Sequence, residues 1–308
     1  MSFADRDGTI WFDGELVDWR DATVHVLNHT LHYGLGVFEG VRAYKTENNG
    51  TCIFRLHEHT KRLFRSAHIV GLKIPFTEEQ ISQAQIDVVK ANGLEEGYLR
   101  PVVIHGSEQM GIRADQLSTR VAIAGWEWPS YMGPEAVDKG IVVRTSSYTR
   151  HHPNIAMCKA KANGQYINSI LALREAQQCG ADEAMLLDPE GYVAEGSGEN
   201  IFIIRDGIMY TPELTSCLDG ITRNAIFSLA GELNLDIQEK RITRDEVYIA
   251  DEAFFTGTAA EVLPIREVDG RQIGAGARGP LTEKLQSMFF DQVRGRRTQN
   301  PEWLTPVE

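Results

Sequence analysis

The segment at residues 200–210 constrains the fold of this 308-residue chain more than any other. Residues 200–204 are almost entirely apolar, and Asp206-Gly207 separates them from a second apolar stretch at residues 208–210. Two apolar runs joined by an Asp-Gly pair predict a β-hairpin. A continuous apolar run of this length is typical of a strand that is buried on both faces. The chain therefore has to cover a buried sheet with other elements.

Strand and helix patterns are mixed along the rest of the chain. A second hairpin is expected near the start, where Asp13-Gly14 separates apolar residues 10–12 from residues 16–17. Thr77 and Gln80 predict a capping box for a helix that runs to about Asn92. Further strands are expected at residues 100–105, 121–126 and 141–144, and further helices at residues 164–179, 222–233 and 281–293. The pattern predicts a mixed α/β (α+β) fold.

The length of the chain favours two domains, because a single hydrophobic core rarely extends over 308 residues. The best candidate for the connection contains Pro129, Gly133 and Pro134, residue types that interrupt regular structure. We predict an N-terminal α/β domain at residues 1–130, a linker at residues 131–136 and a C-terminal domain at residues 137–308. The polar tail after Arg294 is expected to be loosely held.

Composition narrows the class of protein. The chain is 42% hydrophobic and 24% charged, which is ordinary for a globular protein, and its net charge of -12 argues against nucleic acid as a partner. It has no apolar run of about 18 residues that would predict a membrane span. Residues 1–9 are mostly polar, unlike a signal peptide, and the four cysteines lack metal-site spacing. We therefore expect a cytoplasmic protein with reduced thiols, no metal site and no membrane partner.

Two patterns point to chemistry that their context does not support. Residues 274–279 match the G-x-G-x-x-G fingerprint, but they lead into the last predicted helix instead of opening a βαβ unit. We interpret them as a loop before that helix. His25 and His29 have the i, i+4 spacing of a helical metal pair, but the glutamate expected beside the first histidine is absent.

Two glycine-containing segments have a better physical basis for binding an anion. Gly220-Ile221-Thr222-Arg223 immediately precedes a helical pattern, where backbone N–H groups and the Thr222 hydroxyl would form an anion site. The small residues at positions 256–260 follow an apolar strand and would let a ligand approach the main chain. On the residues alone, a capped helix and a strand-end turn explain these segments equally well.

A longer set of motifs follows the chain in order. They are Ile10-Trp11-Phe12-Asp13-Gly14, His32-Tyr33-Gly34, Val37-Phe38-Glu39-Gly40-Val41-Arg42, Glu58-His59 with Arg62-Leu63, Tyr98-Leu99-Arg100-Pro101, Lys161-Ala162-Asn163-Gly164-Gln165-Tyr166, Ala194-Glu195-Gly196-Ser197-Gly198-Glu199-Asn200, Gly220-Ile221-Thr222-Arg223 and Thr256-Gly257-Thr258-Ala259-Ala260-Glu261. In order and spacing the set resembles the bacterial branched-chain amino acid aminotransferases, which are fold-type IV pyridoxal-phosphate enzymes. The resemblance implies a smaller N-terminal α/β domain and a larger C-terminal cofactor-binding domain with a barrel-like sheet core.

The resemblance also implies the residues that hold pyridoxal 5'-phosphate. Lys161 would be the catalytic residue and would hold the cofactor as a Schiff base. Glu195 would face the pyridine nitrogen, and Tyr166 would lie near the phenolic oxygen. The phosphate would be held by Arg62, Ile221, Thr222 and Thr258.

Lys159 is the rival of Lys161 for the cofactor. We choose Lys161 because the family's lysine is followed by a tyrosine five positions on, which here is Tyr166. Asn163 departs from the family pattern, in which many relatives have glycine. Asparagine tolerates left-handed backbone geometry better than most residues, so the turn is expected to survive.

Substrate recognition is implied by a second group of residues. Phe38, Trp128, Tyr131 and Tyr166 resemble the aromatic walls around an aliphatic side chain, and Tyr33 would come from a partner subunit. The substrate carboxylate would lie against Ala259 and Ala260, near Tyr98. Arg100 would meet the second carboxylate of glutamate, and Gly40 belongs to the same group.

The function implied is a ping-pong transfer of the amino group from L-leucine, L-isoleucine or L-valine to 2-oxoglutarate, in a homodimer or a higher homo-oligomer. Alternatives on the same fold are a D-amino acid transaminase, an R-amine transaminase and an aminodeoxychorismate lyase. A nicotinamide oxidoreductase that uses residues 274–279, or a binding protein that keeps the cofactor pocket without activity, are alternatives of other classes.

Overall fold

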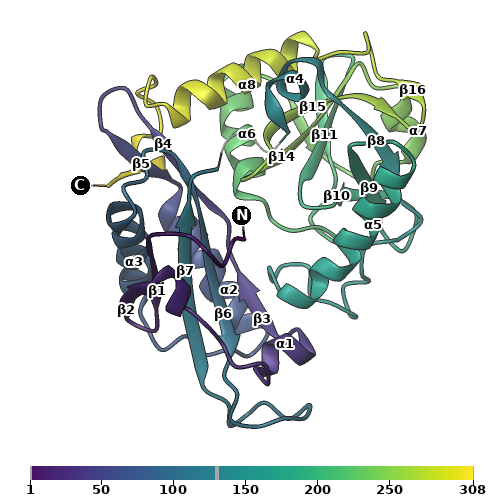
Figure 1. The fold of residues 1–308 in the computed structure, drawn as a ribbon. Helices are drawn as coiled ribbons and strands as arrows, with labels where there is room; N and C mark the ends of the chain where they lie inside the picture. The colour runs from purple at the N-terminus through teal and green to yellow at the C-terminus, as the bar shows by residue number, and fades with distance from the viewer. Residues whose placement is uncertain (1, 129–131, 308) are drawn as a thin grey trace. The chain divides into compact units, whose positions relative to one another are not determined.

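The computed structural model describes residues 2–128 and 132–307, and the chain divides into two compact units. The first unit comprises Met1–Pro129, Ala160–Gly164 and Gln292–Glu308, and the second comprises Ser130–Lys159 and Gln165–Asp291. The chain thus leaves the first unit, returns to it for five residues and ends in it (Figure 1). Each unit is built around its own sheet.

The first unit contains an eight-stranded sheet in the order β17-β5-β4-β6-β7-β1-β2, with β3 paired to β6. Its elements are β1 (Thr9–Phe12), β2 (Glu15–Asp18), η1 (Trp19–Asp21), α1 (His29–Tyr33), β3 (Gly36–Phe38), β4 (Val41–Lys45), β5 (Thr51–Phe54), α2 (Leu56–Ile69), α3 (Glu78–Ala91), β6 (Gly97–His105), β7 (Thr119–Trp126), η3 (Pro301–Trp303) and β17 (Leu304–Pro306). All of its strand pairs are antiparallel.

Two local predictions in this unit are confirmed. Strands β1 and β2 form the expected hairpin, and Asp13 and Gly14 take the positive φ angles (49° and 108°) that its turn requires. Helix α3 begins with the expected capping box, in which the Thr77 side chain accepts from the Gln80 amide and the Gln80 side chain accepts from the Thr77 amide.

Helices α2 and α3 form the core of the first unit together with its sheet. Leu63 of α2 and Ile81 and Val88 of α3 are fully buried, as are Leu99 of β6 and Ile123 of β7. Their spacing along each helix is that of one apolar face. The same core includes Val37 of β3, the residue before Phe38, and Leu63 of α2, the residue after Arg62.

The prediction of a loosely held tail is wrong. Residues 304–306 form β17, which pairs with β5 at the edge of the sheet. Trp303 is 5% exposed, its ring lies edge-on to Phe54 at 5.9 Å between centroids, and the Arg55 guanidinium lies 4.7 Å from it. The tail is therefore anchored by a buried aromatic side chain and by a strand pairing with a distant segment.

The second unit contains a nine-stranded sheet in the order β10-β9-β8-β15-β14-β11-β12-β13, with β16 paired to β15, and the sheet curls into a half-barrel. Its elements are α4 (Gly133–Lys139), β8 (Ile141–Thr145), α5 (Tyr166–Gln178), β9 (Glu183–Leu187), β10 (Val193–Gly196), β11 (Asn200–Arg205), β12 (Ile208–Thr211), α6 (Ile221–Glu232), β13 (Ile237–Glu239), α7 (Arg244–Tyr248), β14 (Glu252–Gly257), β15 (Glu261–Val268), β16 (Arg271–Gln272) and most of α8 (Pro280–Val293). The helix η2 (Asn163–Gln165) lies at the boundary of the two units. Together the two sheets and their helices give the expected mixed α/β architecture.

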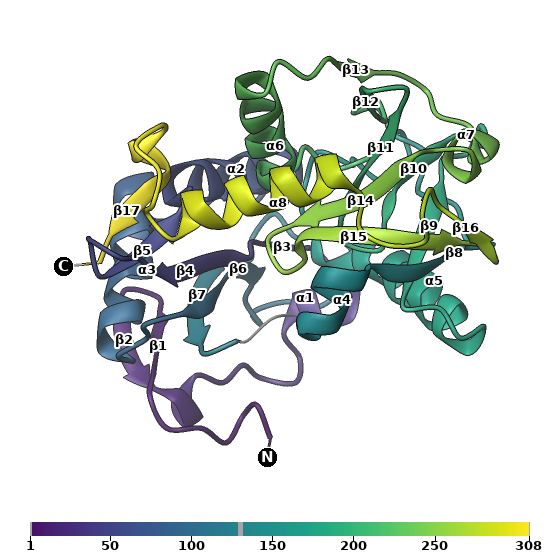
Figure 2. The ribbon, with the colours of Figure 1, turned by 90° about the horizontal axis from the view of Figure 1, so that it is seen from above.

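The hairpin at residues 200–210 is confirmed as β11 and β12. Asp206 and Gly207 both have positive φ (51° and 77°), and β11 is buried along its length apart from Arg205. The central strands β11, β14 and β15 are crowded with apolar side chains, among them Phe254 and Phe255, which are fully buried. Figure 2 shows the strands of this sheet with α6 and α8 alongside them.

The helices predicted in the second half are also present. Helix α5 ends just before Gly180, whose φ is 80°, and α6 and α8 begin within a residue of their expected starts. Helix α4 covers part of the segment expected to be a linker. The glycine-rich residues 274–279 form turns before α8, and a Cβ on Gly274 would lie 1.9 Å from the Asp251 carbonyl oxygen. Close backbone packing therefore accounts for this glycine.

Among residues 2–128 and 132–307, no three His, Cys, Asp or Glu side chains converge as a metal site would require. His29, one of the histidines considered above, is buried and its Nε2 lies 2.8 Å from the Gly111 carbonyl oxygen. Within the same ranges, every helix is too short or too polar to cross a membrane.

Candidate functional site

Lys161 lies in the short segment that returns to the first unit. Its amide donates to Ser66 Oγ at 3.0 Å, and its carbonyl accepts from the Phe38 amide at 3.0 Å. The neighbouring Ala162 forms an isolated antiparallel bridge with Val37. Helix α2 and strand β3 thus fix the Lys161 backbone from two sides, and its Nζ lies 4.9 Å from the centroid of the Phe38 ring.

Phe38 also contacts a second cation. The Arg100 guanidinium lies 4.8 Å from the Phe38 ring, and its Nη2 donates to Tyr98 Oη at 3.1 Å. The Tyr98 side chain packs directly against Gly40. A Cβ added at Gly40 would lie 1.8 Å from Tyr98 Oη, so this contact requires glycine. Strands β3 and β6 and the segment at residues 160–164 therefore bring one aromatic ring, one arginine and one lysine together in the first unit.

Trp128 belongs to an aromatic cluster beside Tyr98. The Tyr98 and Trp128 rings meet edge to face at 4.6 Å, and Trp126 lies 5.9 Å from Trp128 and 5.3 Å from Tyr98. Arg42 Nη2 donates to the Trp128 carbonyl at 3.1 Å. Tyr131, predicted as a further wall residue, lies outside the described residues.

Arg62, predicted as a phosphate ligand, lies on α2 and is paired with Glu39. Its Nε and Nη2 donate to the two Glu39 carboxylate oxygens at 2.6 Å and 2.9 Å. His59 Nδ1 lies 2.8 Å from Glu39 Oε2. Glu39 and His59 are almost fully buried, so three polar side chains form one network inside the unit.

The charges in this network set the protonation of its members. Burial alone would raise the pKa of Glu39, but the charge of Arg62 and the hydrogen bond from His59 outweigh burial and hold that pKa well below its usual range. Burial lowers the pKa of His59, and the positive charges of Arg62 and Lys161 lower that pKa further against the opposing effect of Glu39. The network therefore consists of an ionised carboxylate, a cationic guanidinium and a neutral imidazole, with Lys161 close enough for its charge to act on the imidazole.

Tyr33 lies at the end of α1 and is 46% exposed. Its hydroxyl accepts from the Gly111 amide at 3.2 Å, which ties α1 to the loop between β6 and β7. Its ring lies beside the His29 ring of the same helix, with 4.5 Å between the centroids.

Glu195 lies on β10 of the second unit and is 6% exposed. Its Oε1 lies 2.7 Å from Arg150 Nε, and its Oε2 accepts from the Leu218 amide at 3.2 Å. Both Arg150 and Glu195 are buried, so the guanidinium places a positive charge directly beside the carboxylate. A carboxylate placed in this way is suited to face a protonated ring nitrogen.

The rival lysine is engaged elsewhere. Lys159 belongs to the second unit, and its ammonium donates to the carbonyls of Leu214 and, at 3.3 Å, of Cys217. The Lys159 nitrogen is thus bonded to two main-chain carbonyls of one loop, whereas the Lys161 nitrogen lies beside the Phe38 ring, a predicted substrate residue. This difference in surroundings favours Lys161 over Lys159 as the attachment residue.

The start of α6 has the features of an anion site. The α6 N-cap residue, Gly220, provides no side-chain hydrogen bond to the first turn, so the helix's N–H groups are not capped by a side chain. A Cβ on Gly220 would lie 1.9 Å from Asn200 Oδ1, so only glycine fits there. Ile221 and Thr222, the first residues of α6, are buried at this end.

The remaining predicted residues of the second unit lie at element ends. Thr258, Ala259 and Ala260 form the turn between β14 and β15. The Thr256 hydroxyl at the end of β14 is buried and has no hydrogen-bond partner in the described part of the chain. Tyr166 is the first residue of α5. An uncapped helix start, an unsatisfied hydroxyl and a glycine with no room for a side chain fit a phosphate-bearing cofactor.

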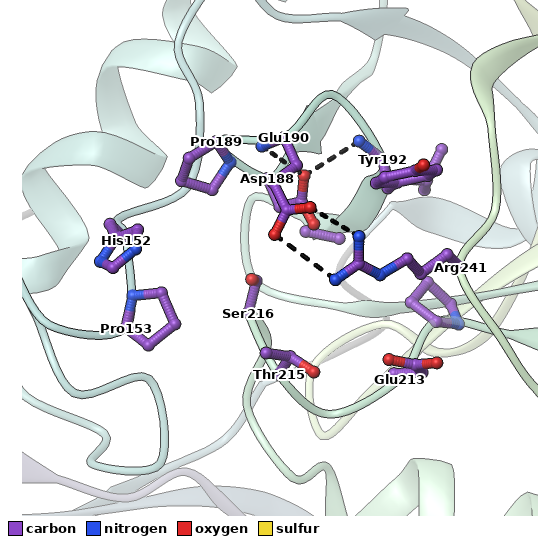
Figure 3. Close-up of a pocket in the computed structure, with 13 residues that line it drawn as sticks. His152, Pro153, Asp188, Pro189, Glu190, Tyr192, Glu213, Thr215, Ser216 and Arg241 are labelled. Carbon is purple, nitrogen blue, oxygen red and sulfur yellow. Dashed lines mark hydrogen bonds and ion pairs between the residues drawn. The ribbon is translucent and has the colours of Figure 1, made fainter.

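A cavity of about 290 Å³ opens elsewhere on the second unit (Figure 3). Asp188 at its wall accepts from the amides of Glu190 and Tyr192, and Arg241 Nη1 pairs with Glu190 at 2.6 Å. Its lining includes residues of the loop between β12 and α6, among them Thr215 and Ser216. None of the predicted site residues lines this cavity.

Four residues of these sites were not assigned a role from the sequence. They are Glu39, His59, Trp126 and Arg150. Glu39 and His59 stand inside motifs of the resemblance, so their position was a signal, but their partnership with Arg62 was not. Arg150 is 45 residues from Glu195, and no local pattern connects the two.

Comparisons with known proteins agree with this geometry. Residues 36–268 match the model of the family described as amino-transferase class IV. A branched-chain-amino-acid aminotransferase of Pseudomonas aeruginosa is 66% identical over 308 residues, which is 100% of both chains. A branched-chain amino acid aminotransferase from the source abbreviated T.th., solved with pyridoxamine 5'-phosphate, superposes with a TM-score of 0.96 at 46% identity, over 98% of this chain and 99% of that one. Its complex with N-(5'-phosphopyridoxyl)-L-glutamate gives a TM-score of 0.94 at 45% identity, with the same coverage. The chain therefore belongs to the class IV aminotransferases and, within them, to the branched-chain-amino-acid aminotransferases.

Proposed function

We propose that this protein transfers the amino group of L-leucine, L-isoleucine or L-valine to 2-oxoglutarate, giving branched-chain 2-oxo acids and L-glutamate. The observation that carries the proposal is the Phe38 ring, against which Lys161 and Arg100 both lie. The aromatic surface suits an aliphatic side chain, and Arg100 suits the second carboxylate of glutamate. The relatives named above act on branched-chain amino acids by name, and one was solved with a phosphopyridoxyl-glutamate.

Pyridoxal 5'-phosphate is the cofactor of this family, and when bound it supplies an electron-withdrawing ring that makes the substrate α-proton acidic. Lys161 Nζ would hold the cofactor covalently and would take and return a proton at the substrate α-carbon. Glu195 would hold a proton on the ring nitrogen, and its pairing with Arg150 supports that role. Tyr166 would donate its hydroxyl to the phenolic oxygen.

The phosphate would be held by Arg62, the Ile221 amide, Thr222 and Thr258. The start of α6 supports this because its N–H groups have no side-chain cap. Two guanidinium nitrogens of Arg62 are bonded to Glu39, which fixes the orientation of the cation. A guanidinium held in this way loses little side-chain entropy when it meets an anion.

The substrate would lie against Phe38, Gly40, Tyr98 and Trp128, with Tyr131 as a further predicted wall. Its α-carboxylate would approach the main chain at Ala259 and Ala260, where side chains are small. The edge-to-face packing of Tyr98 on Trp128 supports a rigid apolar wall.

We also propose that the protein is a homodimer or a higher homo-oligomer in which Tyr33 reaches the site of a partner subunit. The segment that leads to Tyr33 and the loop on either side of its partner Gly111 carry exposed apolar side chains, namely Val24, Val26, Leu27, Leu31, Met110 and Ile112. We call these residues and Tyr33 the α1 patch. Ile112 is 92% exposed, and such a concentration of exposed apolar surface is typical of an interface. A cytoplasmic location, the absence of a nucleic-acid partner and the domain boundaries given above stay predictions.

The visible absorption spectrum tests the proposed function. The purified protein with pyridoxal phosphate should be yellow, and L-leucine should change its absorption band. Lys161→Ala should lose that band and Lys159→Ala should keep it; the reverse result would show that Lys159 is the attachment residue. Comparing L-leucine with D-alanine and an R-amine separates the alternatives on the same fold, and no response to any of them would contradict amino transfer.

A further inference from the structure

Lys159 is a charged residue to which amino transfer assigns no role. It donates to the carbonyls of Leu214 and Cys217, both in the loop at residues 212–220 that joins β12 to α6. This loop contains no helix or strand, so its conformation depends on individual anchors. Lys159 is therefore attached to a segment that regular structure does not hold.

The same loop delivers a hydrogen bond to Glu195. The Leu218 amide donates to Glu195 Oε2 at 3.2 Å, only one residue after the carbonyl of Cys217 that Lys159 holds. Asn200 Nδ2 donates to the Leu218 carbonyl at 2.9 Å and is the second anchor on this side. The position of the Leu218 amide thus depends on Lys159 before it and on Asn200 at its own carbonyl.

The other side of the loop borders open space. Glu213, Thr215 and Ser216 line the cavity shown in Figure 3. The Cys217 side chain is buried, and the Arg223 guanidinium donates to the Pro212 carbonyl at the start of the loop at 3.3 Å. A segment with open space on one side is held by its hydrogen bonds more than by packing. Removing the Lys159 ammonium would leave two carbonyls of the loop without this donor.

The charges near Glu195 also indicate that Lys159 lies close to it. Burial raises the pKa of the Cys217 thiol to about 12, with the negative charge of Glu195 adding to the effect and the positive charge of Lys159 opposing it. The thiol therefore stays protonated, and Lys159 and Glu195 are close enough for their charges to act on the same atom. Together with Arg150, Lys159 places a second positive charge in the surroundings of one carboxylate.

We propose that Lys159 is a positioning residue for amino transfer: its ammonium fixes the β12–α6 loop so that the Leu218 amide and Arg150 together hold the Glu195 carboxylate in place. This inference rests on the proposed function, in which Glu195 holds the proton on the cofactor's ring nitrogen. Lys159 acts through the loop and touches neither substrate nor cofactor.

Lys159→Met tests the inference, because methionine keeps an unbranched side chain and removes the charge and the donors. Hydrogen exchange of the Leu218 amide should become about tenfold faster, the size expected for one lost charge-assisted hydrogen bond. The dissociation constant of pyridoxal phosphate and kcat for L-leucine should each worsen by about tenfold, while KM changes less than about twofold. The pH at which the visible band changes should also shift.

Two further variants serve as controls. Lys159→Arg keeps the charge and the donors, so it should restore exchange, cofactor affinity and kcat to within about threefold of wild type. Lys139→Met removes an exposed ammonium of the same unit that pairs with Glu135 on the surface, and it should change none of these quantities. If Lys159→Met expresses poorly, exchange and cofactor affinity in Lys159→Gln decide the question.

The outcomes distinguish the positioning role of Lys159 from the proposed amino transfer. Wild-type exchange at Leu218 and wild-type cofactor affinity in Lys159→Met would overturn the positioning role and leave the proposed function intact. Loss of the visible band in Lys159→Met together with its retention in Lys161→Ala would overturn the positioning role and the assignment of Lys161, because Lys159 would then be the attachment residue. Amino transfer itself would be contradicted only if the wild-type band did not respond to L-leucine, D-alanine or an R-amine. A drop in melting temperature with no change in kcat or in the pH response would reduce Lys159 to a structural residue.

Discussion

Arg62 and Glu39 form a buried two-point ion pair, with Arg62 Nε 2.6 Å from Glu39 Oε1 and Nη2 2.9 Å from Oε2. The pair joins α2 to the short segment between β3 and β4. His59, one turn before Arg62, binds the same carboxylate. The carboxylate thus holds two side chains of one helix face, and one of them is a proposed phosphate ligand.

Glu39→Gln should destabilise the protein strongly. Glutamine keeps the shape of the side chain but leaves the buried Arg62 charge without its counter-charge, which costs about 3–5 kcal/mol in the free energy of unfolding. Urea unfolding measures this change. Glu95→Gln removes an exposed carboxylate that pairs with the exposed Lys45 on the surface of the same unit, and it should cost less than about 1 kcal/mol. Equal values for the two variants would show that the buried pair contributes no more than a surface pair.

The raised pKa of Glu183 predicts that the folded protein loses stability as the pH rises. It is fully buried on β9, and burial raises the pKa of its carboxyl group, with the charge of Asp182 adding to the effect. The folded protein therefore binds this proton more tightly than the unfolded chain does. The resulting stability is present below the unfolded pKa of a glutamate, about 4.3, and is lost as the pH rises through the folded pKa.

The variant Glu183→Gln should remove this loss. Its melting temperature should fall less between about pH 5 and about pH 8 than that of wild type, because each unit by which the pKa is raised corresponds to about 1.4 kcal/mol. Differential scanning calorimetry of both proteins across this range measures the effect. Parallel curves for the two proteins would mean that Glu183 does not titrate in the folded state.

Gly40→Ala should impair activity more than stability. The new Cβ would lie 1.8 Å from Tyr98 Oη, so the tyrosine must move away from Arg100. We expect kcat/KM for L-leucine to fall by roughly 10- to 100-fold, since a displacement of about 1 Å at a substrate site costs that much. Gly231→Ala is the matched control, because nothing lies within 4 Å of its new Cβ and alanine favours the α6 helix. Its activity should equal that of wild type.

Ile112→Asp should weaken self-association through the α1 patch. Ile112 is 92% exposed, so the substitution costs little within one chain but would bury a charge in an interface between two chains. Light scattering after size exclusion should show a smaller particle, and activity should fall with it because Tyr33 would no longer reach a partner. Ile249→Asp, at an exposed residue of the second unit, should leave the particle size unchanged. A monomeric wild-type protein would contradict the proposed assembly.

Elements whose causes are local were predicted correctly from the sequence. The Asp-Gly turns at residues 13–14 and 206–207 and the Thr77 capping box each depend on a few neighbouring side chains. The tail was predicted wrongly because its order comes from β5, about 250 residues earlier, and from the burial of Trp303. Local polarity carries no information about such a partner.

In the candidate site, too, the sequence marks residues that stand in motifs but does not reveal contacts between distant segments. The motif around Lys161 and the spacing to Tyr166 single out that lysine only through resemblance, since nothing local marks it. Its contact with the Phe38 ring depends on the pairing of residues 37 and 162 across the first unit. Glu195 stands in a motif of the resemblance, but the sequence did not connect Arg150 to it, because the ion pair joins two segments that only the fold brings together.

The pairing of β17 with β5 has a consequence for how the chain is made. The ribosome synthesises residues 304–306 about 250 residues after residues 51–54, so this edge of β5 stays unpaired while the segment between them is made. An exposed strand edge can pair with other chains until it is covered. The nascent chain therefore depends on residues 304–306 to cover that edge, and a chain that stops before them would be released with β5 still unpaired on this side.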